Sequence, residues 1–485
     1  MNDYLNIASI FERITPHMVI LSAFNFITII ALVFFERKNP EKVLKWLGVL
    51  LFLPFVGFVF YLLFGKGPYL GSRRRVLNKI EKDEKYLKLL DIQQELIGDE
   101  KQDDSVADMI SFNIKENKSL CSTNNEVELI TSVEDFYNEL FFEIEHAKSY
   151  VHLCFFIIKR DECGKRLVEL LAKKAKEGVS VKLLYDDLGT FKTPKSFFKP
   201  IKAAGGEVYK FLPLIVNGLF SLNANYRNHR KIAVIDGKVG YTGGSNIGRE
   251  YLGKKKRLSP WKDTQVRIKG IAVNMLNIRF MQDFNFASKQ NCLPQIHRFD
   301  EVANKTTVQI VSDGPDLQEK GIENAYIKAI YEAKKSVWLQ TPYLILDEPF
   351  KQALITAVKS GIDVKIIIPG KPDKPFVYQS TLSYAEELFE YGVEIYIYEG
   401  FIHSKVLVVD DYISSVGTFN LDTRSFKLHF EITAFIYGDS FAKRVKEDFN
   451  QTILSCKQMD YTFYKNLPLF DKFLQRLSIL FSPLF

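Results

Sequence analysis

The chain has 485 residues, of which 47% are hydrophobic and 14% are aromatic, with phenylalanine alone occurring 40 times. This length excludes a small single module, and the apolar content exceeds what a soluble enzyme needs, so some apolar surface is expected to meet lipid. A formal charge of +7 is compatible with nucleic acid, anionic lipid or a phosphorylated substrate as the partner and does not distinguish among them. Five scattered cysteines without a CxxC spacing argue against a disulfide framework or a zinc site.

Two uncharged apolar runs lie near the N-terminus, at residues 18–35 and 46–64. Each is long enough to cross a ~30 Å hydrocarbon core as a helix, so residues 1–65 are predicted to form a transmembrane hairpin. The alternative, a cleaved signal peptide followed by a buried helix, is disfavoured because the first run lacks a small-residue cleavage site. Basic residues after the second span outnumber those in the turn, which predicts a two-span protein of the cell membrane with its main domain in the cytoplasm.

The following segment, residues 66–117, is rich in charge and is predicted to be a linker. Beyond it the sequence repeats once, because a β-rich run, an amphipathic helix and a second strand recur in the same order. The three predicted elements occupy residues 151–158, 164–178 and 179–185 in the first half, and 337–343, 348–361 and 362–368 in the second.

Each half also ends alike, with a strand that runs to Gly270 or Gly438 and a helix that follows it. The pattern predicts an α/β fold of two sandwich domains, residues 118–298 and 299–463, packed with pseudo-twofold symmetry. The tail at 464–485 is amphipathic at helical spacing, so it either lies on a lipid surface or packs on its own domain.

A motif of the form HxKxxxxD occurs once in each half. It comprises His229, Lys231 and Asp236, then His403, Lys405 and Asp410, and each histidine is followed 17 residues later by an asparagine, Asn246 or Asn420. A lone histidine on a strand is usually structural and a lone lysine is usually a solvated charge, but two copies with the same spacing favour catalysis.

Phosphoryl chemistry needs this set of residue types. Lysines and asparagine amides can offset the charge that grows on phosphate oxygens, and imidazoles can serve as nucleophile and proton carrier. Lys231, Lys405, Asn246 and Asn420 are therefore the candidate phosphate-binding residues. A metal is disfavoured because each histidine is paired with lysine and no carboxylate cluster accompanies it. A nucleotide is disfavoured because Gly243-Gly-Ser-Asn lacks the required glycine spacing.

Acidic residues take two other roles. Asp236 and Asp410 lie five residues beyond their lysines with the opposite strand parity, so we expect them to brace the strand ends rather than touch phosphate. Asp263 and Glu431 each lie seven residues before a matched glycine, and an acid on the far ring nitrogen would orient an imidazole. We predict that Asp263 orients His229 and that Glu431 orients His403.

These motifs resemble the phospholipase D superfamily. Asn225-Tyr-Arg-Asn-His-Arg-Lys and Gly417-Thr-Phe-Asn-Leu-Asp-Thr-Arg-Ser, together with Phe34-Phe-Glu-Arg-Lys-Asn-Pro, Leu53-Pro-Phe-Val-Gly and Tyr61-Leu-Leu-Phe-Gly near the N-terminus, are similar to bacterial cardiolipin synthases over nearly the whole chain. The resemblance implies that two phosphatidylglycerols are joined with release of glycerol and without a nucleotide or metal cofactor. It also implies that all six motif residues belong to the catalytic set and that His229 is the nucleophile.

Two positions depart from the pattern of the superfamily. Cys154 stands where relatives commonly carry an acid, and Gly244 replaces a serine or threonine, although Thr418 keeps the hydroxyl in the second half. A small apolar core residue is the alternative interpretation of Cys154.

Two rival functions remain to be compared. A nuclease is disfavoured by the two predicted spans and by the scarcity of basic residues interleaved with aromatics, so no nucleic acid is expected. A scaffold with a decayed site should have lost a histidine or lysine, and both pairs are intact. The expected partners are phosphatidylglycerol and an anionic bilayer, whereas the acceptor (phosphatidylglycerol, phosphatidylethanolamine or water) and the oligomeric state stay open.

Overall fold

The computed structural model describes residues 104–216, 219–220, 226–299, 305–315, 320–465 and 467–481, together with residues 19, 23–30, 32–33, 40–53, 55, 57–58 and 61 near the N-terminus. The chain divides into two compact units. One comprises residues 1–73 and 214–225, and the other comprises residues 74–213 and 226–485.

The first unit contains helix α2 (Pro40–Phe52) and a short hairpin of β6 (Ile215–Val216) and β7 (Leu219–Phe220). Residues 23–30 are also helical, and the ring of Phe24 lies 6.2 Å from that of Phe55 and 5.0 Å from that of Phe58. No helix within the described residues is long and apolar enough to cross a membrane. The predicted spans 18–35 and 46–64 lie partly outside the described residues. Residues 66–103 of the predicted linker lie wholly outside them.

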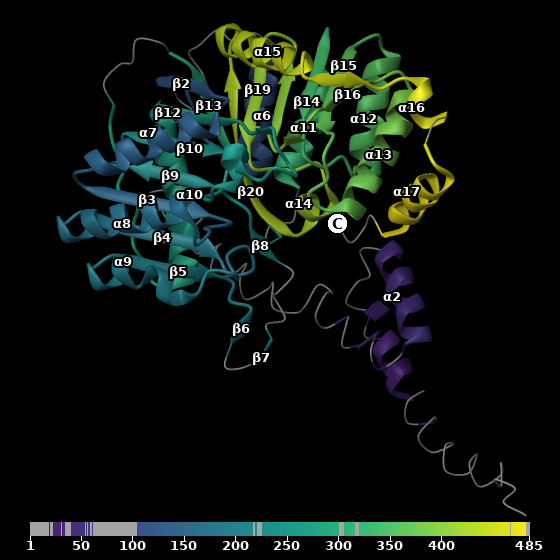
Figure 1. The fold of residues 1–485 in the computed structure, drawn as a ribbon. Helices are drawn as coiled ribbons and strands as arrows, with labels where there is room; N and C mark the ends of the chain where they lie inside the picture. Colours follow the sequence, from purple (N-terminus) through teal and green to yellow (C-terminus); the bar gives the residue numbers. More distant parts are fainter. Residues whose placement is uncertain are drawn as a thin grey trace, which may run out of the picture. The chain divides into compact units, whose positions relative to one another are not determined.

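The second unit contains two sheets built in the same order (Figure 1). The first sheet runs β2-β12-β10-β9-β3-β4-β5, and the second runs β1-β13-β20-β19-β18-β14-β15-β16-β21. Without its edge strands β1 and β21, the second sheet matches the first strand for strand, with β3-β4-β5 and β14-β15-β16 parallel and the remaining pairs antiparallel. The predicted internal repeat is therefore confirmed.

The strands of the first sheet are β2 (Asn125–Ile130), β3 (Tyr150–Phe155), β4 (Ser180–Asp186), β5 (Glu207–Phe211), β9 (Ile232–Ile235), β10 (Val239–Gly243) and β12 (Gln265–Gly270). The strands of the second sheet are β1 (Cys121–Ser122), β13 (Thr307–Asp313), β14 (Ser336–Gln340), β15 (Asp363–Pro369), β16 (Glu394–Tyr398), β18 (Val406–Val409), β19 (Ile413–Gly417), β20 (His429–Tyr437) and β21 (Cys456–Gln458). Central strands such as β3 and β9 are buried along their whole length, since helices cover both faces.

The helices repeat in the same way. The first half carries α7 (Val133–His146), α8 (Glu162–Lys176), α9 (Lys199–Ala203) and α10 (Ala272–Ser288), with short turns at Lys195–Phe198 and Glu250–Lys254. The second half carries α11 (Gly321–Glu332), α12 (Glu348–Lys359), α13 (Pro375–Glu390), α14 (Thr423–Lys427), α15 (Asp439–Ile453) and α16 (Tyr461–Lys465). Asp161 and Asp347 begin α8 and α12 as N-caps, because their carboxylates accept backbone N–H groups of the first turn.

Helix α6 (Asp104–Asn117) corrects the predicted extent of the linker. Its Val106, Met109 and Ile110 are buried in the core of the second half, and its Asn113 amide donates to Gln309 of β13 at 3.1 Å. The end of the segment predicted as linker 66–117 is thus part of a domain. Val106, Met109 and Ile110 form an apolar stripe at helical spacing, but the charged residues around them made the segment resemble a linker in the sequence.

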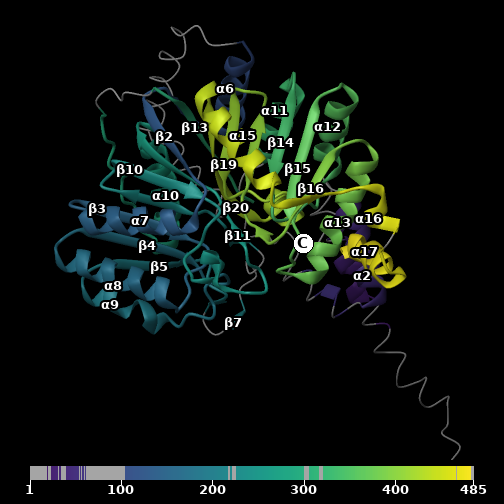
Figure 2. The ribbon, with the colours of Figure 1, turned by 45° about the horizontal axis from the view of Figure 1, so that its top comes forward.

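The two halves pack through α10 and α15, which lie between the sheets (Figure 2). Asp283 of α10 pairs with Arg230 at 2.7 Å, and Arg230 also donates to the carbonyl of Asp313 in the second sheet at 2.7 Å. Reciprocally, Arg444 of α15 donates to the carbonyl of Val127 in the first sheet at 2.9 Å. The buried Arg230 contacts and the partly buried Arg444 contact therefore fix the halves against each other as well as apolar packing does.

The C-terminal helix α17 (Leu469–Phe481) packs against α13. Glu386 of α13, whose pKa is raised by burial, feels the opposing charges of Arg476 and Lys472 of α17. Several apolar side chains of α17 stay exposed, namely Leu469, Phe470, Phe473 and Ile479. Within the tail predicted at 464–485, helix α17 thus packs on its own domain, one of the two expected alternatives, and it leaves several apolar side chains exposed.

The two motif aspartates hold equivalent turns. Asp236, at a φ of 52°, accepts the backbone N–H groups of Lys148 (2.8 Å), Ser149 (2.7 Å) and Tyr150 (2.9 Å) at the start of β3. Asp410, at a φ of 50°, accepts three N–H groups at the start of β14 in the same way. Both carboxylates brace strand ends, as the strand parity predicted. Their membership of the catalytic set stays a prediction.

Replacing Asp236 with Asn should lower stability and leave the chemistry in place. Asn tolerates the positive φ, so the loss comes from charge-assisted hydrogen bonds and should amount to roughly 1–3 kcal/mol. Denaturant unfolding of the variant in detergent, together with its activity per folded molecule, checks this. A stably folded Asp236→Asn protein with no activity would contradict a bracing role.

Candidate active site

Each motif histidine lies in a segment that crosses to the other half. Strand β8 (Arg227–Asn228) pairs in parallel with the start of β20, and β17 (Phe401–Ile402) pairs in parallel with β11 (Trp261–Lys262). The backbone N–H of His229 donates to Phe430 at 2.9 Å, and that of His403 donates to Lys262 at 2.7 Å. The histidines therefore stand just before β9 and β18, not within them, and each is held by the opposite repeat.

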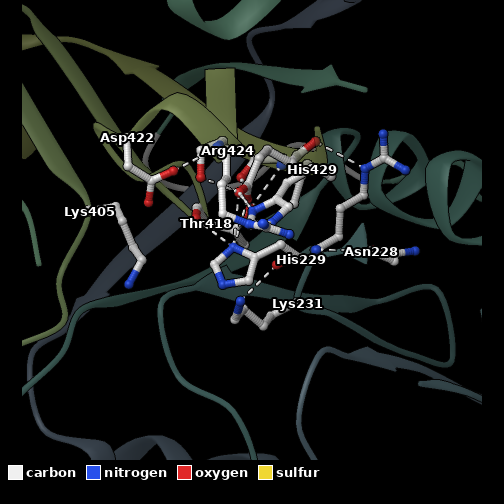
Figure 3. Close-up of polar contacts among 12 residues, drawn as sticks. Asn228, His229, Lys231, Lys405, Thr418, Asp422, Arg424 and His429 are labelled. Atoms are coloured by element: carbon white, nitrogen blue, oxygen red, sulfur yellow. Dashed lines mark hydrogen bonds and ion pairs between the residues drawn. The ribbon is translucent and has the colours of Figure 1, made fainter. Parts of the chain in front are cut away.

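The acid partners follow from this crossing. Nδ1 of His229, whose surroundings are drawn in Figure 3, lies 3.0 Å from both carboxylate oxygens of Glu431. Nδ1 of His403 lies 2.8 Å from Asp263. The prediction that Asp263 orients His229 and Glu431 orients His403 is therefore wrong: the partners are exchanged. The sequence repeat gives the two acids equivalent positions, but it does not say which half supplies each histidine's neighbour.

Two serines that the sequence analysis missed support these acids. Ser425 donates to Glu431 at 2.9 Å and Ser245 donates to Asp263 at 3.1 Å. Ser245 follows Gly244 directly, whereas Ser425 lies in α14, so the two serines do not occupy equivalent positions in the repeat and no shared spacing could have identified them. Thr418 adds a second hydroxyl to Glu431 at 2.5 Å, whereas Asp263 instead accepts the backbone N–H of Thr264 at 2.9 Å.

Gly244 is the counterpart of Thr418, and the packing explains why it lacks a side chain. A Cβ at this position would lie 2.0 Å from Oδ1 of Asp263 and 2.8 Å from the carbonyl oxygen of His403. Any side chain would therefore displace the acid from its histidine. The departure from the superfamily pattern at Gly244 accompanies the close approach of Asp263.

The two lysines are buried beside the histidines. Nζ of Lys231 donates to the carbonyl of His229 at 2.7 Å, and Nζ of Lys405 donates to that of His403. Burial lowers the pKa of Lys231 to about 7 and that of Lys405 to about 8, and Glu431 and Asp263 oppose both shifts. Repulsion from Lys405 also lowers the pKa of Lys231, so an anion that both ammonium groups contacted would relieve their desolvation and repulsion.

The motif asparagines line the same region. The side-chain oxygen of Asn246 accepts the N–H of Ile157 at 3.0 Å, which fixes the orientation of its amide. Asn420 is 4% exposed, and its side-chain oxygen has no hydrogen-bond partner among the described residues. Their role in binding phosphate stays a prediction.

Aromatic rings pack against both imidazoles and differ between the halves. His429 lies 5.5 Å from His229 by ring centroids, and Trp261, at the equivalent position, lies 5.4 Å from His403. Burial lowers the pKa of His429 to about 3, and its Nε2 accepts from Arg424 at 3.3 Å (Figure 3). His429 is thus a neutral neighbour of His229. The sequence analysis missed His429. Its position two residues before Glu431 on the same strand could have indicated that it lies beside the acid.

His229, His429 and Glu431 also bring three potential metal ligands within 4.8 Å of one another. The Glu431 oxygens already accept from His229, Thr418 and Ser425, so the set is arranged as a hydrogen-bonded imidazole–carboxylate pair. This arrangement suits an acid that orients an imidazole.

Cys154 lies in the core. It is 1% exposed, its thiol lies 3.7 Å from the carbonyl oxygen of Arg230, and burial raises its pKa well above the usual value. A buried protonated thiol of this kind packs as a small apolar residue.

Comparisons with known proteins show the family of the chain. A family model described as "Cardiolipin synthase, PLD-like domain" matches residues 140–257 and 326–453, one match in each half. The chain belongs to the cardiolipin synthases of the phospholipase D superfamily. It is 41% identical to the "Major cardiolipin synthase ClsA" of Bacillus subtilis (strain 168), across 96% of this chain and 99% of that one, and 40% identical to a cardiolipin synthase of Listeria monocytogenes serotype 4a, across 96% and 98%.

Two further matches concern the fold and the N-terminus of this cardiolipin synthase family member. A crystal structure of phosphatidylserine synthase from Haemophilus influenzae Rd KW20 aligns with a TM-score of 0.60 and 16% identity, covering 78% of this chain and all of that one, which supports the shared fold. A second family model, "Phospholipase_D-nuclease N-terminal", matches residues 23–66.

The exchanged acids can be tested with a phosphatidyl p-nitrophenyl ester, whose leaving group needs no proton. If Glu431 orients the nucleophile His229, Glu431→Gln should slow the initial burst of p-nitrophenol roughly 100-fold or more. Asp263→Asn should keep the burst and slow the later steady state, because it affects His403. Stopped-flow absorbance separates the two phases, and a burst lost in Asp263→Asn but kept in Glu431→Gln would contradict the exchanged pairing.

Proposed function

We propose that this protein makes cardiolipin by moving the phosphatidyl group of one phosphatidylglycerol to a second, with release of glycerol. The observation that carries the proposal is the pair of crossed imidazole–carboxylate contacts, His229–Glu431 and His403–Asp263, beside two buried lysines. Such a site supplies a nucleophile, a proton carrier and two positive charges, which are the parts that phosphodiester exchange needs. It needs neither a nucleotide nor a metal for this.

The first step is attack on the donor's phosphorus by His229. Its Nδ1 lies between acceptors, Glu431 at 3.0 Å and the carbonyl oxygen of Thr418 at 3.2 Å, so Nδ1 carries the proton and Nε2 keeps its lone pair. A bond forms from Nε2 to phosphorus while the bond to the glycerol oxygen breaks. His403 gives its proton to that oxygen, and Lys231 and Lys405 stabilise the negative oxygens.

The two acids have different kinds of partner. Glu431 accepts from two hydroxyl groups and His229, whereas Asp263 accepts from one hydroxyl group, the backbone N–H of Thr264 and His403. Burial, followed by the charges of Lys231 and Lys405, holds the pKa of His229 well below its usual range. Burial lowers the pKa of His403 to about 4 against the opposing effect of Asp263. His229 thus enters neutral, and His403 is the imidazole better placed to become protonated when an anionic substrate arrives.

The second step returns the site to its starting state. Neutral His403 takes the proton from the hydroxyl of the second phosphatidylglycerol, whose oxygen attacks phosphorus as the bond to His229 breaks. Both histidines and both lysines are less than 10% exposed, so few waters compete with that hydroxyl. Transfer is therefore favoured over hydrolysis.

Membrane attachment completes the proposal. The N-terminal family match at 23–66 overlaps both predicted spans, and the described helical residues there expose large apolar side chains such as Phe26, Ile27 and Leu51. The open apolar side chains of α17 offer a second contact with lipid. We place the protein in the cell membrane through two spans, with the catalytic unit on the cytoplasmic side as the distribution of basic residues indicates.

Lipid analysis of a host that lacks its own cardiolipin synthase tests the function. Expression of this chain should produce cardiolipin with loss of phosphatidylglycerol, as measured by mass spectrometry of extracted lipids. Lys231→Met serves as the matched control and should lose at least ~100-fold of the activity, because it removes one buried positive charge. Accumulation of phosphatidic acid instead of cardiolipin would show that water is the acceptor and would overturn the transferase.

The covalent intermediate can be trapped separately. His403→Ala, given the phosphatidyl p-nitrophenyl ester, should complete the first step and then stall, because no base activates the acceptor. Rapid quenching, digestion and mass spectrometry should find an acid-labile phosphatidyl adduct on His229. An adduct on a different residue in the unmodified protein, or inversion at phosphorus with a chiral phosphorothioate donor, would exclude the double displacement.

A further inference from the structure

The loop that follows β15 is held rigidly at the junction of the two halves. The N–H groups of Gly370 and Lys371 donate to Gly400 at 3.0 and 3.1 Å. From the first half, Arg257 donates to the carbonyls of Pro372 (2.7 Å) and Asp373 (3.1 Å). The backbone of this loop is therefore fixed by both repeats before any substrate binds.

Lys374 ends this loop, and its side chain is exposed. Its ammonium lies 3.4 Å from the hydroxyl of Tyr343 and 4.9 Å from the centre of that ring, and within the part of the chain that the structure describes it forms no ion pair with a carboxylate. The nearby acid Asp373 instead accepts the Tyr343 hydroxyl at 2.5 Å. Lys374 is thus a positioned cation whose charge is open to a ligand.

Several contacts place Lys374 at the mouth of the active site. Tyr343 stands two residues before Ile345, whose N–H donates to Leu421 at 2.8 Å, directly after Asn420. The charge of Lys374 also contributes to the lowered pKa of His229 and acts on Asp422, the N-cap of α14. Lys374 therefore lies within electrostatic reach of the nucleophile but does not touch it.

The opposite half of the rim has a different character. The loop after β4 exposes Leu188 and Phe191, which are 38% and 63% exposed, and its Lys192 lies over the ring of Phe191 at 5.7 Å. Phe191 and Lys374 each lie five residues after matched strands, β4 and β15, so they are equivalent positions in the repeat. The first half thus has an exposed aromatic ring where the second half has a fixed cation.

The two alcohols of the proposed reaction differ in one charged group. The glycerol that leaves is neutral, whereas the acceptor phosphatidylglycerol carries its own phosphodiester one glycerol length from the attacking hydroxyl. The buried lysines already serve the reacting phosphate, so the second phosphate needs a cation further out. We propose that Lys374 binds the phosphate of the acceptor lipid and thereby selects phosphatidylglycerol over neutral alcohols; this rests on the function proposed above.

The experiment compares two acceptors with one donor. Purified full-length protein in mixed micelles receives phosphatidylglycerol, and cardiolipin formation is measured beside exchange of radiolabelled glycerol into phosphatidylglycerol. Both reactions share the first step, but labelled glycerol carries no phosphate. In Lys374→Met the ratio of cardiolipin formation to glycerol exchange should fall about tenfold, since a charge-assisted hydrogen bond at an exposed site is lost. Lys374→Arg should restore most of that ratio.

Lys192→Met is the matched control, because it removes an exposed rim lysine from the other half. It should keep the ratio of the unmodified protein. An unchanged ratio in Lys374→Met, or an equal fall in Lys192→Met, would overturn the assignment in favour of general surface charge. An unmodified protein that performed neither reaction would overturn the proposed function itself, and the role of Lys374 with it.

Discussion

The active site depends on two short strand pairs that cross between the repeats, β8 with β20 and β17 with β11. Each pair ends directly before a catalytic histidine on one strand and an acid on the other. The backbone hydrogen bonds from His229 to Phe430 and from His403 to Lys262 set the register. A slip of one residue would turn the acid to the opposite face, so the imidazole tautomers are determined by backbone pairing as much as by side chains.

This arrangement also explains how a symmetric motif supports an asymmetric reaction. The crossed strands impose the same geometry on both histidines, and the neighbours then differ. Thr418 and His429 surround the pair of His229, whereas Gly244 and Trp261 surround the pair of His403. These unequal neighbours are where two otherwise equivalent histidines can acquire the different roles that the proposed mechanism gives them.

Much of the fold could be predicted from the sequence, because the repeat and its periodicities are local properties. The strand–helix–strand unit of each half, the final strand and helix that meet at Gly270 and Gly438, and the bracing by Asp236 followed from spacing and parity alone. Which acid contacts which histidine could not be predicted, because Asp263 and Glu431 are equivalent in the repeat. Only the packing of the two halves distinguishes them. Helix α6 was missed because charged residues surround Val106, Met109 and Ile110, whose partners lie about 200 residues away.

The exchange of acids between halves has a consequence for how such a protein can arise and vary. A chain with one repeat would hold a histidine without its carboxylate, and only association of two copies would rebuild the site, with both positions then constrained to be identical. Joining the repeats in one polypeptide removes that constraint. Each half can then acquire residues suited to one role, and Gly244 and Thr418 are such a pair of different residues at equivalent positions. Loss of the acid in one half would leave the histidine of the other half without its carboxylate partner.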